Sequence, residues 1–317
     1  MTGPGNVEWS SEKSAHDAVS AVDVSVCICT YRRAHIAETI RSVLAQRDLG
    51  LSRIEIVVAD DDPQLSAQSI VDELAASASI PVRCVPCGAR NVATARNACL
   101  DTARGEWIAF IDDDELALPD WLNSLIAARQ TYNADVVKGA VRAVYPAGTP
   151  GWIRAADPYS RDYGPTGQMP THLATGNVLF RRALAEASRL RFDPNFGRTG
   201  GEDTDFFRRV RLTNAKIVAS REAVVEEIVP IERLSLAYLS GRARRMGQVE
   251  AHKSRLGLSD ATLAGNVGLA ILAVTLLWAH PLLRAFAARP AYKSFAKFWY
   301  SFGVLEGVAL GRHDEMI

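Results

Sequence analysis

The chain has 317 residues, and its 36 basic and 36 acidic side chains give a formal net charge of zero at pH 7. This balance argues against a nucleic-acid-binding protein, which needs a basic surface to displace counterions. Apolar residues make up 48% of the sequence, enough to build a sizeable core. The five cysteines form no regular framework, which indicates reduced thiols and a cytosolic location.

Residues 1–21, which begin MTGPGNVEWS, lack the basic and apolar regions of a signal peptide. Chain ends that are polar and contain Gly and Pro rarely pack against a core. We therefore interpret this segment as a disordered tail.

An alternation of strands and helices is predicted from Val24 onward. Short apolar runs predict buried strands at Val24–Thr30, Ile54–Ala59, Val82–Val85 and Trp107–Ile111. Apolar residues at helical spacing predict a helix after each strand, around residues 36–44, 70–74, 91–103 and from 119 onward. Gly105 is interpreted as the C-cap of the third helix. The rhythm is typical of an α/β protein with a Rossmann-like, mostly parallel, doubly wound sheet.

Three of the predicted strands end in polar or acidic residues. The ends are Thr30-Tyr31-Arg32, Asp60-Asp61 and Asp112-Asp113-Asp114. Ligands of doubly wound sheets bind beyond the carboxyl ends of the strands. Residues far apart in the sequence are therefore expected to meet at one edge of the sheet.

The chain changes character after about residue 145. Residues 145–167 are rich in Pro, Gly, Tyr and Asp without a clear period, which is typical of a functional loop. His172–Phe180 then predicts a strand, followed by a short helix to about Ser188. The glycine-rich segment Gly197–Val210 leads into a helix predicted to begin near Asp203. We expect residues 22–232 to form one α/β domain.

Residues 233–317 are predicted to form a helical extension. The stretch 261–283 has no Lys, Arg, Asp or Glu, and its length just suffices to span a bilayer. Basic residues flank it on both sides, which suits an anionic membrane surface. A long core helix is the alternative. We favour membrane association, through a peripheral or a single-span segment.

The run Asp112-Asp113-Asp114-Glu115 places four adjacent carboxylates at a strand end. They repel one another at neutral pH, and a divalent cation would relieve that repulsion. Mg²⁺ and Mn²⁺ prefer hard oxygen ligands together with substrate phosphates. The alternatives are a solvated acidic turn and a phosphatase of the Asp-x-Asp type, with Asp112 as its nucleophile. Leu116 at the fifth position and the late place of the strand count against the phosphatase.

Two further segments carry candidate chemistry. Asp203 follows glycines at a predicted helix start, where a carboxylate either caps the helix or serves as a general base. Arg96-Asn97 lies on the third helix, either on a solvated face or aimed at phosphates.

Seven segments occur in one order along residues 24 to 211: VSVCICTYRR, EIVVADDD, ATARNACLDTARGEWIAFIDDDE, LPDWL, TGNVLFRR, FDPNF and GGEDTDFFRR. Together they resemble the family 2 glycosyltransferases, which have the GT-A fold. The later VVEEIVPIERLSLAYLSGRARRMG is similar to bacterial exopolysaccharide glucosyltransferases of the succinoglycan type.

The resemblance implies a nucleotide site at the strand ends. Cys29, Thr30, Tyr31 and Arg32 would form the cradle for the base, with Tyr31 stacking on uracil. Asp61 would accept a hydrogen bond from the uracil N3–H.

The resemblance also implies a diphosphate and metal site. Arg96 and Asn97 would approach the ribose or phosphates, and Asp113 would touch the ribose or the metal shell. Asp112 and Asp114 would bind Mn²⁺ or Mg²⁺, with Asp114 as the direct ligand.

The acceptor side is implied by the later segments. Asp203 would be the catalytic base, beside Glu202 and Gly201, and Gly176 and Asn177 would line the sugar and acceptor side.

Three features depart from the family pattern. Asp62-Pro63 replaces a small residue and Ser, and Glu226 and Glu227 stand where many relatives supply a metal-binding histidine. Processive members carry Gln-x-x-Arg-Trp, whereas this chain has only Arg242 and Arg245, followed by Met246. We therefore expect one sugar to be transferred per encounter, with Arg242 or Arg245 near the acceptor or the diphosphate.

The sequence thus predicts an inverting, metal-dependent hexosyltransferase of bacterial surface polysaccharide synthesis. The expected partners are a nucleotide-sugar donor, with a UDP-hexose as the first choice, a saccharide or lipid-linked oligosaccharide acceptor, and the cytoplasmic face of the inner membrane. An Asp-x-Asp phosphatase and an inactive nucleotide-binding membrane scaffold are the alternatives.

Overall fold

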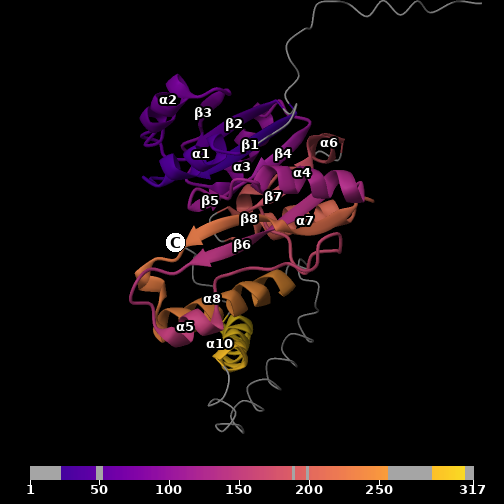
Figure 1. Ribbon diagram of the computed structural model, residues 1–317. Coiled ribbons are helices and arrows are strands. Elements are labelled where there is room, and N and C mark those ends of the chain that lie inside the picture. Colours follow the sequence, from indigo (N-terminus) through magenta and orange to yellow (C-terminus); the bar gives the residue numbers. More distant parts are fainter. Residues whose placement is uncertain (1–22, 48–52, 188–189, 198–199, 256–287, 311–317) are drawn as a thin grey trace, which may run out of the picture.

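One mixed sheet of eight strands, with helices on both faces, dominates the described part of the computed structural model (Figure 1). The structure describes residues 23–47, 53–187, 190–197, 200–255 and 288–310. The strand order is β3-β2-β1-β4-β7-β6-β8-β5. The predicted tail at residues 1–21 and the apolar stretch at 261–283 lie outside the described residues.

The first half of the sheet is parallel, as predicted. Its strands are β1 (Val24–Thr30), β2 (Ile54–Asp60), β3 (Val82–Pro86) and β4 (Trp107–Phe110). The helices that follow the first three strands are α1 (Ile36–Leu44), α2 (Gln68–Ser77) and α3 (Val92–Thr102). Apolar residues of α1 and α2 pack on one face of the sheet and those of α3 on the other, which explains why these strands read as continuous apolar runs.

The second half of the sheet is mixed, so the prediction of a mostly parallel sheet is wrong there. β7 (Val178–Arg181) runs antiparallel to both β4 and β6 (Val136–Val144). β5 (Glu115–Ala117) is antiparallel to β8 (Ile217–Ile228), which is parallel to β6. Apolar runs do not encode strand direction, so the sequence pattern left this point open.

Two long strands were not predicted, and polar residues explain both. β6 contains the buried Lys138, a charged residue within an otherwise apolar run of the sequence. β8 carries exposed charges at Arg221 and Glu222 where its pairing with β6 is interrupted by a bulge. Conversely, the predicted strand His172–Phe180 is reduced to β7. These local features mask the alternation that would otherwise identify a strand.

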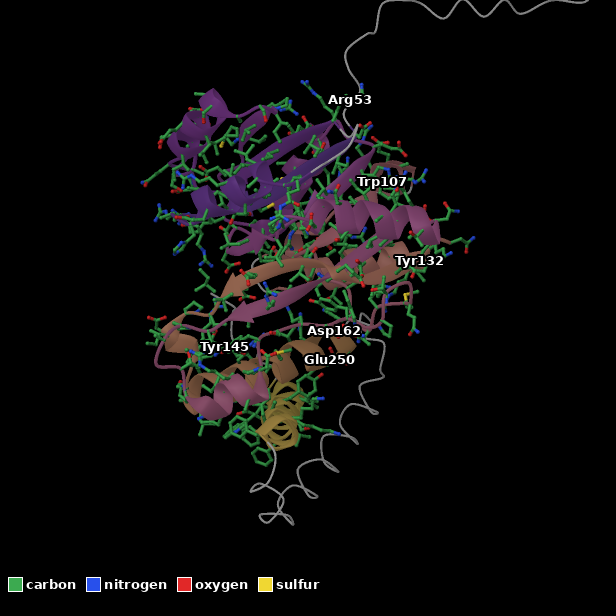
Figure 2. The ribbon with its side chains drawn as sticks, viewed as in Figure 1. Arg53, Trp107, Tyr132, Tyr145, Asp162 and Glu250 are labelled. Carbon is green, nitrogen blue, oxygen red and sulfur yellow. The ribbon has the colours of Figure 1, made fainter. Side chains whose placement is uncertain are left out.

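The remaining elements cover the sheet or form a helical layer beside it. They are α4 (Trp121–Tyr132), α5 (Gly151–Ala156), α6 (Arg182–Ala187), η1 (Pro194–Phe196), α7 (Glu202–Arg211), η2 (Ile231–Arg233), α8 (Leu236–Arg255) and α10 (Ala288–Leu310). α5 lies inside the segment predicted as a functional loop. It packs with α8 and α10 in a helical layer beside the sheet. The labels of Tyr145 and Glu250 locate this layer in Figure 2.

None of the helices in the described ranges is both long enough and apolar enough to cross a membrane. The prediction of membrane association depended on residues 261–283, so it stays a prediction.

Gly105 does not cap α3, contrary to the sequence interpretation. The C-cap is Ala103, in an extended conformation. Gly105 instead lies against β1, where its amide donates to the Ser25 hydroxyl at 2.8 Å. A Cβ on Gly105 would stand 2.5 Å from the Ser25 backbone nitrogen, so this close approach requires glycine.

We expect Gly105→Ala to destabilise the protein by about 1–3 kcal/mol, because the added methyl group would overlap backbone atoms that cannot move aside. Gly151→Ala is the matched control, since a Cβ there meets nothing within 4 Å. It should change the free energy of unfolding by no more than about 0.5 kcal/mol. Urea denaturation of both variants measures the difference, and equal effects would contradict the packing argument.

Candidate active site

A pocket of about 260 Å³ lies at the carboxyl ends of β1 and β2, beside the start of α3. Five of the predicted nucleotide-binding residues line it, namely Cys29, Thr30, Tyr31, Asp61 and Asp113. Arg33, Val92 and Ala95 complete the lining. The parallel register pairs Thr30 with Asp60, which brings the two strand ends together. The predicted convergence at one edge of the sheet is therefore present.

The three aspartates after β2 have different partners. Asp60 accepts hydrogen bonds from the amides of Asp62 and Ala67, which shapes the turn. Asp62 pairs with Arg32 at 3.1 Å. Asp61 is the one that reaches the pocket, and it accepts from the Ala89 and Asn91 amides at 3.0 and 2.5 Å.

Arg32 acts on the pocket indirectly. Its guanidinium lies 5.3 Å from the centre of the Tyr31 ring and is held by Asp62. Tyr31 is 39% exposed, which leaves a ring face available for a base. Arg32 therefore supports Tyr31, and its predicted part in the cradle for a base stays a prediction.

The thiols around the pocket are poor nucleophiles. Cys29 lies 3.9 Å from Cys99, sulfur to sulfur, and this hydrogen bond together with burial holds the pKa of Cys29 well above its usual range. Burial also raises the pKa of Cys84 to about 11 and that of Cys87 to about 12. These groups are protonated at neutral pH, which fits a structural role.

The three aspartates after β4 also point to different places. Asp112 lies against Gly176, where a Cβ would stand 2.5 Å from its carboxylate oxygen. Asp113 accepts a hydrogen bond from the Thr30 hydroxyl at 2.7 Å, and burial raises its pKa to about 6. Asp114 has a side chain that is 31% exposed, and its carboxylate lies 3.9 Å from Arg33. Burial also raises the pKa of Asp112, against the opposing effect of Arg96.

This donor set fits a hard divalent cation that is completed by other ligands. Asp112 and Asp114 provide carboxylate oxygens, and burial together with the nearby charge of Asp114 raises the pKa of Asp112, so a bound cation would favour its ionised form. Within the described ranges, however, no group of three or more His, Cys, Asp or Glu side chains is arranged to bind a metal ion. Mg²⁺ and Mn²⁺ commonly keep waters and bind substrate phosphates, which two protein carboxylates would allow.

Glu226 and Glu227 are engaged elsewhere. Glu226 pairs with Arg142 at 2.7 Å. Glu227 pairs with Arg161 at 2.9 Å and with Arg233 at 3.4 Å. Neither residue is placed as a third metal ligand.

Arg96 connects the aspartates after β4 with the start of α7. It forms a buried ion pair with Glu202, and its positive charge is also close enough to Asp112 and Asp203 to interact with both. Its guanidinium lies 5.6 Å from the centre of the Phe192 ring. Residues predicted separately for the donor and acceptor sides therefore meet at one cation.

The start of α7 presents two carboxylates with spare acceptor capacity. Gly200 and Gly201 both have positive φ, at 79° and 102°, a backbone conformation that favours glycine. Asp203 is half-buried and accepts from the Thr204 amide at 2.6 Å. One buried oxygen of Glu202 has no hydrogen-bond partner among the described residues.

A buried charge network under the aspartates was missed by the sequence analysis. Lys138 donates to the Gly176 and Asn177 carbonyls, and burial lowers its pKa to about 8. Glu115 accepts from the Asp112 amide at 3.1 Å and from Arg161 at 3.4 Å. The lysine within the apolar run of β6 was the one feature of the sequence that could have indicated this network.

Two predicted site residues have structural roles instead. The Asn97 side chain donates to the Phe192 carbonyl and accepts from the Phe192 amide, at 2.8 and 2.9 Å. The Asn177 side chain is fully buried; it accepts from the Trp121 ring nitrogen and donates to two backbone carbonyls. Their amide groups are therefore occupied by protein. Gly176, in contrast, does lie against Asp112.

Arg242 and Arg245 do not line the pocket at the sheet edge. Arg242 belongs to a second pocket in the helical layer, where its guanidinium lies 5.1 Å from the centre of the Tyr159 ring. Arg245 lies along α8 near Gly241. Their predicted place near the diphosphate is not seen.

Comparison with solved structures supports the fold. The crystal structure of S. aureus TarS 1-349 in complex with UDP aligns over 92% of each chain with a TM-score of 0.51 and 20% identity. A complex of the same protein with UDP-GlcNAc aligns with a TM-score of 0.50 and 17% identity, over 92% of this chain and 93% of that one. At identities this low, the structural alignments show a shared fold and nothing further.

Sequence relatives show the family. The family described as Glycosyl transferase family 2 matches residues 25–188. The succinoglycan biosynthesis protein ExoM of Rhizobium meliloti is 38% identical over 248 residues, which are 78% of this chain and 80% of that protein. A glucosyl-dolichyl phosphate glucuronosyltransferase of Haloferax volcanii is 27% identical over 56% of this chain and 58% of its own length. The chain belongs to glycosyltransferase family 2, and its mixed α/β sheet is a GT-A fold.

We expect Arg96→Met to lower the free energy of unfolding by about 3–5 kcal/mol, because Glu202 would be left buried without its counter-charge. Arg142→Met, which breaks an exposed pair with Glu226, is the control and should cost less than about 1 kcal/mol. Chemical denaturation at neutral pH compares them. A small loss for Arg96→Met would show that the buried pair is not needed for folding.

Proposed function

We propose that this protein is an inverting, metal-dependent glycosyltransferase that moves one hexose from a nucleotide-sugar, a UDP-hexose first among them, to a saccharide or lipid-linked acceptor. We place the reaction in bacterial surface polysaccharide synthesis, at the cytoplasmic side of the inner membrane. The proposal depends mainly on the position of Arg96. Its side chain forms a buried ion pair with Glu202 and interacts electrostatically with Asp112 and Asp203, so it links the pocket to the start of α7. The similarity to ExoM supports the biological setting.

The pocket at the sheet edge supplies the groups that a nucleoside diphosphate needs. Tyr31 offers an exposed ring for stacking, and Asp61 offers a fixed carboxylate for a base N–H. UDP and UDP-GlcNAc are the ligands named for the structurally similar TarS. These features favour a uridine nucleotide over other donors.

The aspartates after β4 would receive the diphosphate end. Asp112 and Asp114 would hold Mg²⁺ or Mn²⁺, which supplies positive charge to the departing diphosphate when bound. Thr30 keeps Asp113 directed toward the pocket rather than toward the same cation. Arg33 lies within 4.0 Å of Asp113 and Asp114 and adds a second positive charge at this end.

The start of α7 would receive the acceptor. Asp203 would take the proton from an acceptor hydroxyl as the hydroxyl oxygen attacks the anomeric carbon. The free oxygen of Glu202 can accept a hydrogen bond from a sugar hydroxyl. A single displacement of this kind inverts the anomeric configuration and needs no protein nucleophile, in keeping with the protonated Cys29.

Of the two alternative functions, a phosphatase and an inactive nucleotide-binding scaffold, only the scaffold still needs an experimental test. Membership of glycosyltransferase family 2 removes the reason to consider an Asp-x-Asp phosphatase. An inactive nucleotide-binding scaffold would share the fold and the pocket, so activity measurements distinguish it from an enzyme.

Donor binding should depend on the metal through Asp114. In a panel of UDP- and GDP-hexoses with Mn²⁺, we expect at least one to raise the melting temperature, since a ligand at 100 times its Kd stabilises by about 2.7 kcal/mol. Asp114→Ala should lose the Mn²⁺-dependent part of that shift. Asp120→Ala is the control, because Asp120 is exposed, directly precedes α4 and does not line the pocket. A full Mn²⁺-dependent shift in Asp114→Ala would rule out its metal role.

Asp203→Asn should lower kcat by about 10²–10⁴-fold, because the amide cannot accept the proton. The melting-temperature shift caused by the donor should persist, since the nucleotide pocket is unchanged. Asp120→Asn is the matched control and should retain kcat. Full activity in Asp203→Asn would remove it as the base, and a wild-type protein that binds donor without any turnover would favour the scaffold.

A further inference from the structure

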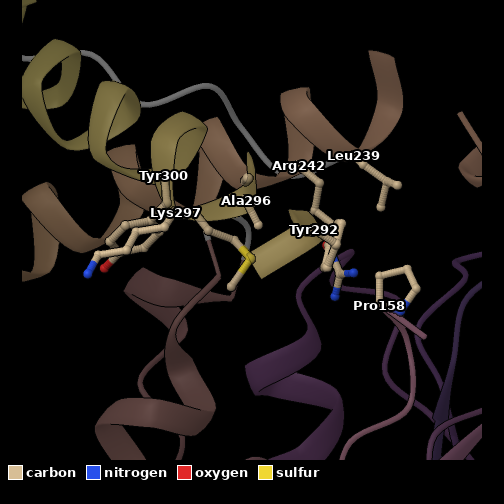
Figure 3. Close-up of a pocket in the computed structure, with 9 residues that line it drawn as sticks. Pro158, Leu239, Arg242, Tyr292, Ala296, Lys297 and Tyr300 are labelled. Carbon is tan, nitrogen blue, oxygen red and sulfur yellow. The ribbon is translucent and has the colours of Figure 1, made fainter. Parts of the chain in front are cut away.

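A second pocket, of about 390 Å³, lies between α8, α10 and the segment after α5, and the proposed sugar transfer does not use it (Figure 3). Most of its lining is apolar or aromatic. The lining residues with charge are Arg242 on α8 and Lys297 on α10. Figure 3 shows Arg242 with Tyr292 toward one side of the pocket and Lys297 with Tyr300 toward the other.

Close packing of α8 against α10 holds the pocket walls in place. A Cβ on Gly247 would overlap the Tyr300 carbonyl, and one on Gly303 would overlap the Arg244 carbonyl, so the helices touch through glycine. Arg244 also donates to both carboxylate oxygens of Glu306, one of them at 2.8 Å. The pocket is therefore a preformed feature of the helical layer.

Basic residues outnumber acidic ones on the two helices of this pocket, although the charge of Glu250 reaches the lining residue Tyr300. α8 and α10 together contain eight Lys and Arg but two Glu, and Glu306 is taken by Arg244. Within the parts of the chain that the structure describes, neither Arg242 nor Lys297 forms an ion pair. Arg242 is oriented by the Tyr159 ring instead, 5.1 Å from its centre.

We propose that this pocket binds the phosphate head of an anionic lipid. Arg242 supplies the charge and the hydrogen-bond donors that a phosphate needs at one side of the pocket, and Lys297 adds positive charge at the other side. Leu239, Met246 and the tyrosine rings supply an apolar surface for the start of the hydrocarbon chain. A volume of about 390 Å³ is in the range of ligand pockets. The proposal does not depend on the proposed sugar transfer.

The test measures binding of the full-length protein to vesicles without any sugar donor. One set contains phosphatidylglycerol in phosphatidylcholine and the other phosphatidylcholine alone. We expect binding to the anionic vesicles only. The double variant Arg242→Gln/Lys297→Gln should weaken it roughly 30-fold, at about 5- to 6-fold per cation near an anionic surface. The matched control Arg41→Gln/Lys216→Gln removes two exposed charges elsewhere and should change binding less than about 2-fold.

Ala296→Trp separates binding in the pocket from attraction to a basic surface. It fills the pocket without changing charge, so we expect it to weaken vesicle binding as well, with the melting temperature confirming that it folds. Retained binding in this variant would overturn the pocket assignment. Unchanged binding in the double variant would do the same. A melting-temperature shift with inorganic phosphate that needs Arg242, without vesicle binding, would assign the site to a soluble phosphate instead.

Discussion

The buried ion pair between Arg96 and Glu202 is the interaction on which the arrangement of the active site depends. Burying two charges costs several kcal/mol each unless they are well paired, so this contact strongly restricts how α3 and α7 approach each other. Asn97, the next residue on α3, holds the backbone of Phe192. Phe192 in turn stacks on Phe206 of α7 at 4.2 Å between ring centres. Polar and apolar contacts thus fix the same geometry.

The floor of the site is equally constrained. Lys138 binds the carbonyls of Gly176 and Asn177, while Glu115 and Arg161 connect the aspartate run to Glu227 on β8. These groups lie on segments far apart in the sequence, and their charges compensate one another in a region with little water. The carboxylates above them are therefore held in place by a buried network of charged side chains and backbone groups.

The sequence was most informative where a pattern is local. β1 and α1 begin and end as predicted, and five of the residues that the family resemblance implies for a nucleotide site line the pocket at the strand ends. β6 and β8 were missed because Lys138 and the charged residues near the β8 bulge interrupt their apolar patterns. The side chains of Asn97 and Asn177 were misassigned for another reason. The sequence of a motif is the same whether its polar residue contacts a ligand or the protein backbone. Which of the two it contacts depends on packing between distant parts of the chain.

The thiol at the pocket has a consequence for how this protein can be studied. Cys29 lines the pocket at the sheet edge, yet its contact with Cys99 and its burial keep it protonated. Alkylating reagents react with the thiolate, so they will modify this position slowly even though it lies beside the proposed donor site. Protection from alkylation is consequently a weak reporter of donor occupancy. Spectroscopic labels are better attached through cysteines introduced at exposed positions, because the native ones will compete little for the reagent.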